Sequence, residues 1–291
     1  MIAEAEVKQG AQEAQNLVTM FEAQARQRAE RTAIRHKKGG AWQDVAWSEL
    51  ARRARRVADG LASHGLAPGD RVAIIGETNL EWILADLGIL GAGGITVTIY
   101  QSNRPSECQF ILADAGARLI FCDSAAQVAK IREVRHQLPA LEGIVRVSGP
   151  AADDFETTLE ELERAGDAYV QANPAAHAAR LARIRRDDPA SIIYTSGTTG
   201  NPKGVVLTHG NWVYEAEAVE SLKIIDQNDL ILMFLPMAHS FAKVIEAVWF
   251  RTGATGAFVE SLEKMVDNAG QLRPTVMPSV FSTLPRSGKM A

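Results

Sequence analysis

The sequence predicts an α/β fold that contains a parallel β-sheet, and three observations carry this prediction. Runs rich in β-branched residues alternate with helical periodicity from about residue 40 onward. Residues 71–100 fit a strand, a helix and a second strand, a βαβ unit that implies parallel strands joined by a right-handed crossover. Helix and strand signals then repeat this pattern less cleanly between residues 105 and 148.

The first expected elements are a strand and a long helix. Residues 41–47 alternate as a strand does, and Ser48 is expected to cap the helix that follows. Gly65 and the Pro-Gly-Asp turn at 68–70 end this helix. Its apolar face carries Leu50, Val57 and Leu61.

The βαβ unit consists of a strand at 71–76, a helix that Asn79 is expected to cap, and a strand at 95–100. The helix has apolar residues at helical spacing, namely Leu80, Ile83, Leu84 and Leu87. Residues 83–100, which comprise the end of this helix and the second strand, are also the stretch that most resembles a membrane span. Asp86 and a cluster of glycines interrupt the stretch, so a buried helix, a turn and a buried strand explain it better.

The later elements continue the alternation. Residues 149–190 are rich in alanine and charge, and there a short exposed helix is expected at 158–166. The other expected helices cover 105–116, 125–138, 175–190, 211–223, 240–250 and 261–269. The other expected strands cover 118–123, 143–148, 192–195, 205–207, 230–238 and 254–259.

Composition and charge indicate a globular protein. Hydrophobic residues make up 46% and charged residues 23% of the 291 residues, and the net charge is −4. A negative chain gives no support for a nucleic-acid partner, whose phosphates demand a basic face. Cys108 and Cys122 show no CxxC spacing and are interpreted as reduced thiols, which fits a cytoplasmic protein. The first 15 residues lack the basic and apolar segments of a secretory signal.

Four arginines lie close together at Arg180, Arg183, Arg185 and Arg186. They are compatible with an anion-binding patch. Because Asp187 and Asp188 follow at once, a solvated helix face is the preferred interpretation.

The stretch that carries the chemistry is "YTSGTTGNPKGVVLTHGN", residues 194–211. Glycines let successive backbone N–H groups converge on an anion, small hydroxyls add donors, and Lys203 adds a compact positive charge. These are the parts of a polyphosphate-binding loop, although a flexible turn between two strands remains the alternative. The Walker A pattern fails because Gly204 follows the lysine, and "GETNLE" after the first parallel strand lacks the dinucleotide fingerprint.

This stretch closely resembles the signature of the adenylate-forming, or AMP-binding, superfamily, with agreement at the ten positions 195–204. Residues 47–124 resemble the N-terminal portion of bacterial long-chain fatty acyl-CoA synthetases, and "LPMAHSFAKV" at 235–244 is similar to the next family motif. The resemblance implies the helix-flanked, mostly parallel sheets of the large N-terminal domain. It also implies a ligase that uses ATP, Mg²⁺ and coenzyme A to convert a long-chain fatty acid to acyl-adenylate and then acyl-CoA.

The resemblance also assigns roles to residues of the loop. Lys203 is expected to neutralise the leaving phosphates, and Thr195 is the hydroxyl expected to reach Mg²⁺. The residues expected to hold the β- and γ-phosphates are Thr195, Ser196, Gly197, Thr198, Thr199 and Gly200.

His239 is the second catalytic candidate, because it matches the family residue beside the reacting carboxylate. The alternative is a structural histidine at a strand-to-helix junction, with Ser240 capping the helix. Trp212 and Trp249 are expected in the core or in the wall of the groove rather than as stacking platforms. His209 is expected to orient the start of a helix rather than transfer a proton.

The resemblance covers only the front of a complete family member. Residues 1–280 correspond to a partial AMP-binding domain, and residues 281–291 form an atypical tail that suggests truncation or a frameshift. Two alternatives to a fatty acid ligase remain open: adenylation of a different carboxylic acid, and a non-catalytic remnant that binds a nucleotide. We expect a cytoplasmic protein without a membrane span, and peripheral contact with a membrane remains open.

Overall fold

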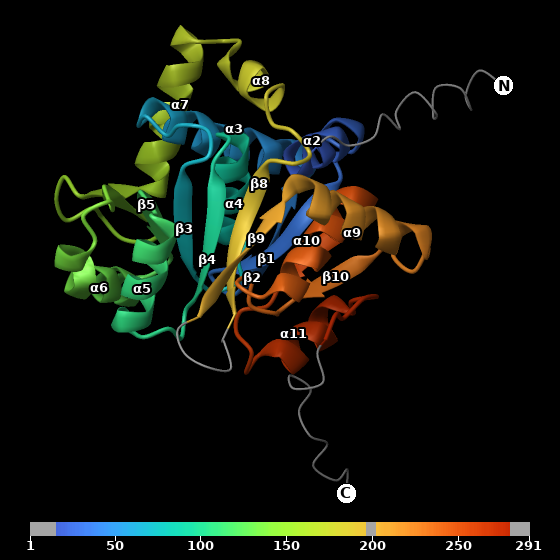
Figure 1. Cartoon of the computed structure of the whole chain (residues 1–291). Helices are drawn as coiled ribbons and strands as arrows, with labels where there is room; N and C mark the ends of the chain where they lie inside the picture. The colour runs from blue at the N-terminus through green and yellow to red at the C-terminus, as the bar shows by residue number, and fades with distance from the viewer. Residues whose placement is uncertain (1–15, 196–201, 280–291) are drawn as a thin grey trace, which may run out of the picture.

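The computed structural model describes residues 16–195 and 202–279, which form two β-sheets with helices on and between them (Figure 1). The helices are α2 (Leu17–Gln27), α3 (Trp47–Ser63), α4 (Leu80–Gly91), α5 (Pro105–Ala115), α6 (Ala125–Val134), the 3-10 turn η1 (Arg135–Gln137), α7 (Leu159–Ala172), α8 (Ala176–Leu181), α9 (His209–Ser221), α10 (Ser240–Thr252) and α11 (Met265–Leu272). The strands are β1 (Thr32–Lys38), β2 (Ala41–Ala46), β3 (Arg71–Gly76), β4 (Ile95–Tyr100), β5 (Leu119–Cys122), β6 (Gly143–Arg146), β7 (Glu156–Thr158), β8 (Pro189–Thr195), β9 (Lys203–Thr208), β10 (Leu230–Met233) and β11 (Thr255–Phe258).

The larger sheet has seven strands in the order β7-β6-β5-β3-β4-β8-β9. Neighbouring strands are parallel from β7 to β8, which confirms the predicted parallel sheet. The last strand, β9, is antiparallel to β8 and forms one edge of the sheet. The carboxyl end of β8 and the amino end of β9 therefore meet at the lower edge of the sheet in Figure 1.

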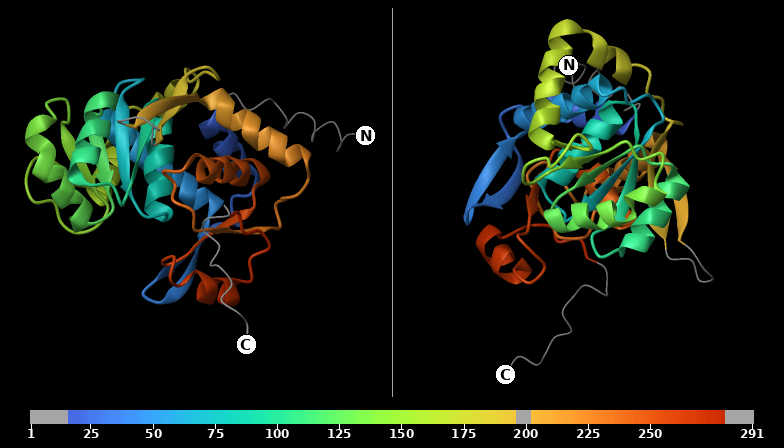
Figure 2. Two further views of the ribbon diagram at one scale, coloured as in Figure 1. Left: turned by 60° about the horizontal axis from the view of Figure 1, so that its bottom comes forward. Right: turned by 90° about the vertical axis from the view of Figure 1, so that its left-hand side faces the viewer.

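The smaller sheet has four strands in the order β10-β11-β1-β2. It joins two segments far apart in the chain, since β1 pairs in parallel with β11 and antiparallel with β2. No element was predicted before residue 41, so both β1 and α2 differ from the expectation. In Figure 2 the β1–β2 hairpin lies beside α11, where the Trp42 indole N–H donates to Gln271 at 2.9 Å.

Alternate residues of β3 face two separate cores, because successive side chains of a strand point to opposite faces. Ala73 and Ile75 face the core under α5 and α6, which also contains both cysteines as buried free thiols. Val72 and Ile74 face the core under α3 and α4. This second core continues without a break through α2, α9 and α10 to the smaller sheet, so the two sheets share it.

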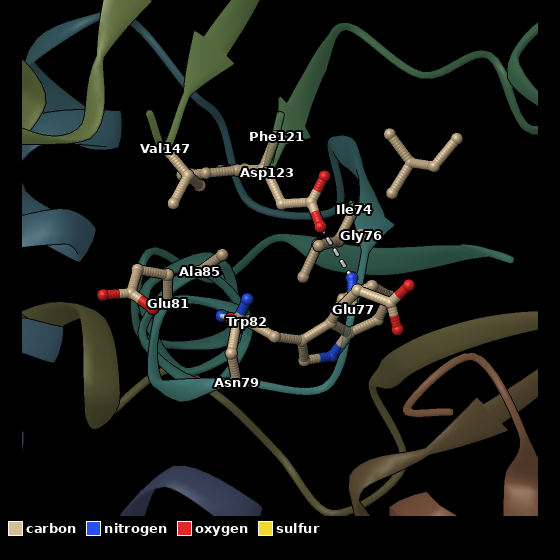
Figure 3. Close-up of a pocket in the computed structure, with 11 residues that line it drawn as sticks. Ile74, Gly76, Glu77, Asn79, Glu81, Trp82, Ala85, Phe121, Asp123 and Val147 are labelled. Carbon is tan, nitrogen blue, oxygen red and sulfur yellow. Dashed lines mark hydrogen bonds between the residues drawn. The ribbon is translucent and has the colours of Figure 1, made fainter. Parts of the chain in front are cut away.

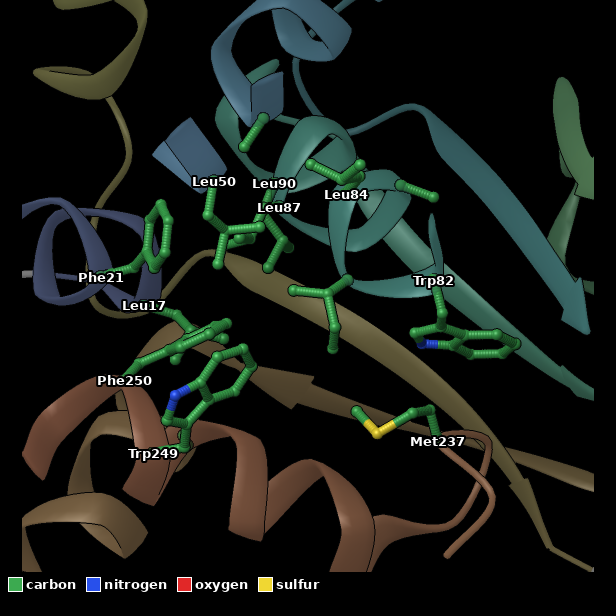
Figure 4. Packing of buried hydrophobic residues seen from close by; sticks show 14 of the residues in the cluster. Leu17, Phe21, Leu50, Trp82, Leu84, Leu87, Leu90, Met237, Trp249 and Phe250 are labelled. Atoms are coloured by element: carbon green, nitrogen blue, oxygen red, sulfur yellow. The ribbon is translucent and has the colours of Figure 1, made fainter. Parts of the chain in front are cut away.

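Aromatic rings fill the shared core near the smaller sheet. Phe21 of α2 packs on Phe250 of α10 with ring centroids 5.0 Å apart, and Trp47 packs on Trp249 at 5.7 Å. Figure 4 shows Phe21, Trp249 and Phe250 together, below Leu50 of α3 and Leu87 of α4. Trp212 and Trp249 are both buried, as the sequence analysis expected.

Helix α7 corrects an expectation, because it is not a short exposed helix. Leu159, Leu162 and Gly166 are buried residues of a 14-residue helix that packs against α3. The approach is very close: a Cβ added at Gly166 would stand 2.0 Å from the carbonyl oxygen of Arg56. Arg53 and Arg56 of α3 then reach Glu163 of α7 at 2.7 and 2.6 Å.

Two predicted helix caps have opposite outcomes. The Asn79 side chain accepts from the backbone N–H of Trp82 at 2.8 Å and caps α4, as expected. The prediction for Ser48 is wrong, since α3 begins at Trp47 and its cap, Ala46, offers no side-chain acceptor. The first N–H groups of α3 instead donate to backbone oxygens of the turn between α2 and β1, with Ser48 N–H on Ala29 O at 3.0 Å.

Some other boundaries also differ from those expected. The strand predicted at 230–238 ends at Met233, and the helix predicted at 261–269 spans Met265–Leu272. The short strand β7 was not expected. Residues 83–100 form the end of α4, a turn and β4, as predicted. Within residues 16–195 and 202–279, no helix combines the length and apolarity needed to cross a bilayer.

The α3–α7 contact yields a stability prediction. Gly166→Ala should lower the free energy of unfolding by about 1–3 kcal/mol, because the added methyl group has no space. Gly270→Ala in α11 is the matched control, since a Cβ there meets nothing within 4 Å, and it should be neutral or stabilising by up to about 1 kcal/mol. Urea denaturation of both variants measures this, and equal stabilities would contradict the packing account.

Candidate functional site

The β8–β9 hairpin brings Thr195 and Lys203 together. Thr195 is the last residue of β8 and Lys203 the first of β9, and they are direct partners across the antiparallel ladder. Both side chains are exposed at the carboxyl edge of the larger sheet. The other predicted loop residues, Ser196, Gly197, Thr198, Thr199 and Gly200, lie outside the described residues. The structure therefore places the two ends of the predicted phosphate loop beside one another.

Tyr194 fixes the end of β8 from the opposite face. Its hydroxyl donates to Asp114 of α5 at 2.6 Å. Burial, with the Asp114 carboxylate beside it, raises the pKa of Tyr194 well above its ordinary value, so the hydroxyl keeps its proton and remains a donor. The strand end that precedes the loop is thus anchored to a helix of the sheet's other layer.

The motif at 235–239 is held against the same edge by two threonines. The Thr78 hydroxyl donates to the carbonyl oxygen of Leu235 at 2.7 Å and accepts from the Met237 N–H at 3.2 Å. The Thr98 hydroxyl donates to Ala238 O at 3.4 Å. Because Thr98 is the register partner of Ile193, Ala238 lies beside β8 about two residues, or 7 Å, before Thr195.

His239 caps α10 itself, so the expectation that Ser240 caps this helix is wrong. Its Nδ1 accepts from the backbone N–H of Phe241 at 3.1 Å, and its backbone N–H donates to Pro236 O. The imidazole is exposed and leaves Nε2 for a ligand. His239 therefore combines the structural role that the sequence analysis considered with an exposed position on the edge that carries Thr195.

Three buried charged residues connect the two sheet layers just behind this motif. Lys243, one turn after His239 on α10, reaches the Asp86 carboxylate of α4 and lies 2.5 Å from Glu246. All three side chains are at most 2% exposed. Burial raises the pKa of Glu246 to about 8, so this carboxyl is largely protonated at neutral pH. Burial alone would lower the pKa of Lys243, but Asp86 and Glu246 outweigh it and raise that pKa.

His209 is a buried residue at the start of α9, where the sequence analysis expected it to orient the helix. Its Nδ1 accepts from the Leu17 N–H at 3.4 Å and so connects α9 to α2. Burial, with Lys243 nearby, lowers its pKa to about 4, which keeps the ring neutral at physiological pH. This structural role confirms the expectation.

A narrow crevice lies at the carboxyl ends of β3 and β5, where the strand order reverses (Figure 3). Asp123 accepts from the Glu77 backbone N–H at 2.8 Å. Burial and the Asp123 charge raise the pKa of Glu77. The free volume is only about 10 Å³, so the crevice holds no more than a water molecule.

The exposed Thr195 and Lys203 side chains are better suited to bind a polyanion than a metal cluster. Lys203 offers an exposed ammonium group and Thr195 an exposed hydroxyl at the carboxyl edge of parallel strands, where ligands of α/β sheets usually bind. Among the described residues, no group of three His, Cys, Asp or Glu side chains could hold a metal ion. The Thr195 hydroxyl is an oxygen donor that Mg²⁺ accepts when phosphates and waters supply its other ligands.

Sequence reasoning missed the residues that hold the site in place. Thr78 stands in "GETNLE", a stretch that was tested only for a dinucleotide fingerprint. Asp86 was noted only because it interrupts an apolar run, and Lys243 and Glu246 interrupt another. Isolated charges in apolar helices are the signal that could have found the buried group, because such charges require partners.

Comparison with protein families and curated proteins agrees with the predicted resemblance. The family model described as AMP-binding enzyme matches residues 21–286. The long-chain-fatty-acid–CoA ligase FadD15 of Mycobacterium bovis is 34% identical over 243 residues, which are 83% of this chain and 39% of that relative. The chain thus spans about two fifths of the length of this curated relative.

Solved structures confirm the predicted fold class. The inhibitor-bound N-terminal domain of FACL13 from Mycobacterium tuberculosis superposes with a TM-score of 0.77 at 25% identity, covering 92% of this chain and 64% of that one. The anthranilate CoA ligase AuaEII, solved with anthranoyl-AMP, superposes with a TM-score of 0.80 at 22% identity over 91% of this chain and 49% of that one. At 22% identity, the similarity to AuaEII is evidence for the fold only.

Glu246 yields a pH prediction. Because its pKa is about 8 in the folded protein and 4.5 ordinarily, the folded state holds more protons between these values. The stability that Glu246 contributes is complete below pH 4.5 and is lost as the pH rises to about 8. Glu246→Gln should therefore be more stable than the unchanged chain by roughly 1–3 kcal/mol at pH 9, with the difference shrinking toward pH 5.

Chemical denaturation at pH 5, 7 and 9 measures this difference. Glu160→Gln is the control, since Glu160 is an exposed carboxylate of α7, and its curve should run parallel to that of the unchanged chain. A Glu246→Gln difference that does not change with pH would contradict the assignment.

Proposed function

The chain belongs to the AMP-binding enzyme family, and from this membership we propose that it carries the phosphate-binding part of an ATP-dependent long-chain fatty acid–CoA ligase. The β8–β9 hairpin carries the proposal, since its strand ends bring Thr195 and Lys203 together at the carboxyl edge of the sheet. The choice of acid is supported by a relative, FadD15, which is named for long-chain fatty acids.

In the first proposed step, a carboxylate oxygen of the fatty acid attacks the α-phosphorus of ATP. The bond to the β-phosphate oxygen breaks, acyl-adenylate forms and pyrophosphate leaves. Negative charge develops on the departing phosphates, and donors already fixed there stabilise the transition state. Lys203 would neutralise this charge. The other proposed phosphate-binding residues are Thr195, Ser196, Gly197, Thr198, Thr199 and Gly200.

Mg²⁺ would supply charge neutralisation between phosphate oxygens. The Thr195 hydroxyl is the protein ligand that we propose for it, with phosphates and waters as the remaining ligands. The exposed position of this hydroxyl beside Lys203 supports the proposal.

His239 is proposed to line the site of the acyl carboxylate. Its support is the exposed ring on the motif that Thr78 and Thr98 hold against the sheet edge. In the second step, the thiol sulfur of coenzyme A attacks the acyl carbonyl carbon, a thioester forms and AMP leaves. The thiol proton passes to solvent or to a base that is not identified among the described residues.

Activation of another acid is the second candidate. AuaEII, which is named for anthranilate, has the same fold, so this fold also serves acids other than fatty acids. That structure shares the fold at 22% identity, whereas FadD15 shares 34%. A remnant that binds a nucleotide without turnover is the third candidate.

The first prediction of this proposal concerns Lys203. Lys203→Ala should weaken the binding of Mg·ATP and of inorganic tripolyphosphate about tenfold, the effect of losing a hydrogen bond to a charged group. Isothermal titration calorimetry on the whole chain measures both ligands. Lys38→Ala is the control, because Lys38 is exposed at the far end of β1, and it should bind as the unchanged chain does. Equal affinity in Lys203→Ala, or no binding by the unchanged chain, would refute the assignment of the loop.

The second prediction concerns the acid. Exchange of labelled pyrophosphate into ATP should depend on palmitate and should fall strongly in Lys203→Ala and His239→Ala. A parallel reaction with anthranilate separates the candidates. Exchange with anthranilate alone would select the second candidate, and ATP binding without exchange for any acid would select the remnant.

A further inference from the structure

A cavity of about 270 Å³ lies at the amino end of the larger sheet, opposite the edge that carries Thr195. It opens where β4 begins at Ile95 and where β8 begins at Pro189. Its volume is far larger than that of the crevice between β3 and β5. Such a volume exceeds what one ordered water needs and admits a small organic molecule.

The cavity contains a buried donor. His209 lines it and is 1% exposed. Since Nδ1 accepts from the Leu17 N–H, the neutral ring carries its proton on Nε2. No hydrogen bond from this Nε2–H to another described residue is observed, and Nε2 is not among the fully buried polar atoms that lack a partner. The Nε2–H is therefore available to donate to a ligand in the cavity.

Two arginines add positive charge. The Arg180 guanidinium pairs with Asp59 through Nη2, while its Nε is buried without a partner among the described residues. Arg183 also lines the cavity, and no described residue accepts from its guanidinium. The opposing charge is Asp188, whose Oδ2 already accepts from the Arg185 N–H at 2.8 Å. Available donors therefore outnumber available acceptors.

The remaining walls are apolar and comprise Pro68, Ala92, Ile95, Ile184 and Pro189. Apolar walls with a few convergent donors are typical of a site for a small amphipathic molecule. We propose that this cavity is a second ligand site of the chain, and that its ligand is a small organic acid with an apolar body. The carboxylate accepts from Arg183 and His209, and the apolar body lies against Ile95 and Ile184.

This site is distinct from the proposed phosphate site. β8 runs seven residues from Pro189 at the cavity to Thr195 at the loop, a distance of about 20 Å. The two sites nevertheless touch the same hairpin, because β9 leads from Lys203 directly into His209. A ligand in the cavity therefore contacts the fixed end of the hairpin, and a nucleotide would contact its other end.

The test uses hexanoate as the probe and the whole chain. We expect hexanoate to shift the imidazole ¹⁵N signal of His209 in NMR titrations. Arg183→Ala should weaken this binding about tenfold, as loss of a hydrogen bond to a charged group does. Arg185→Ala is the matched control. It removes the same charge two residues along the chain, and the Arg185 side chain does not line the cavity.

Further variants and a neutral probe distinguish binding in the cavity from binding at the proposed fatty acid site. Lys203→Ala and His239→Ala should leave the hexanoate-induced shift of the His209 signal unchanged, and neutral hexanol should shift this signal only at higher concentration than hexanoate does. The proposal fails if hexanoate does not shift the His209 signal, if Arg183→Ala and Arg185→Ala bind it equally, or if binding is lost in His239→Ala but not in Arg183→Ala. The last outcome would place hexanoate at the proposed fatty acid site, which would leave the proposed function intact.

Discussion

The ion group of Lys243, Asp86 and Glu246 connects the two halves of this molecule. Lys243 and Asp86 are buried opposite charges that would be strongly unfavourable if separated, because each would lose its hydration without gaining a partner. The largely protonated Glu246 lies against the same lysine. Asp86 belongs to α4 of the larger sheet's layer, whereas the other two belong to α10, which packs toward the smaller sheet. Sliding α10 along α4 would break the group, so the ion group restricts the relative placement of the two layers in a way that apolar contacts alone do not.

The candidate site depends on this placement because it is assembled from both layers. The phosphate-loop ends come from the β8–β9 hairpin, and the His239 motif comes from the segment that leads from β10 into α10. Thr78 and Thr98 join the two with hydrogen bonds to backbone atoms of residues 235–238. Met237 of this segment and Trp82 of α4 are both buried members of the shared core (Figure 4), so apolar packing supports the same junction. The motif is held by backbone contacts that tolerate changes of its side chains.

Much of the fold and part of the site could be predicted from the sequence. The hydrophobic periodicity of residues 71–100 predicted the βαβ unit. The glycines, hydroxyls and Lys203 of residues 194–211 predicted the phosphate loop that the β8–β9 hairpin carries. The misses have physical causes. α2 packs against α10, more than two hundred residues away, and so leaves little local signal. β1 also pairs with the distant β11, but the Gly39-Gly40 turn of its hairpin with β2 is a local signal that was not used. Ser48 was expected to cap α3, but the backbone oxygens of Ala29 and Arg31 accept from its first N–H groups instead. The pairing of Asp86 with Lys243 joins positions 157 residues apart, which no local pattern reveals.

The edge strand β9 has a consequence for how this chain behaves at high concentration. Val205 and Val206 point to opposite faces of the sheet, and both are exposed. Among the described strands β9 pairs with β8 alone, so one row of its backbone N–H and C=O groups has no strand beside it. A strand that is apolar on both faces and free along one side can accept a further strand from another molecule. Self-association by sheet extension would therefore begin at β9, beside the lysine that is proposed to hold the nucleotide.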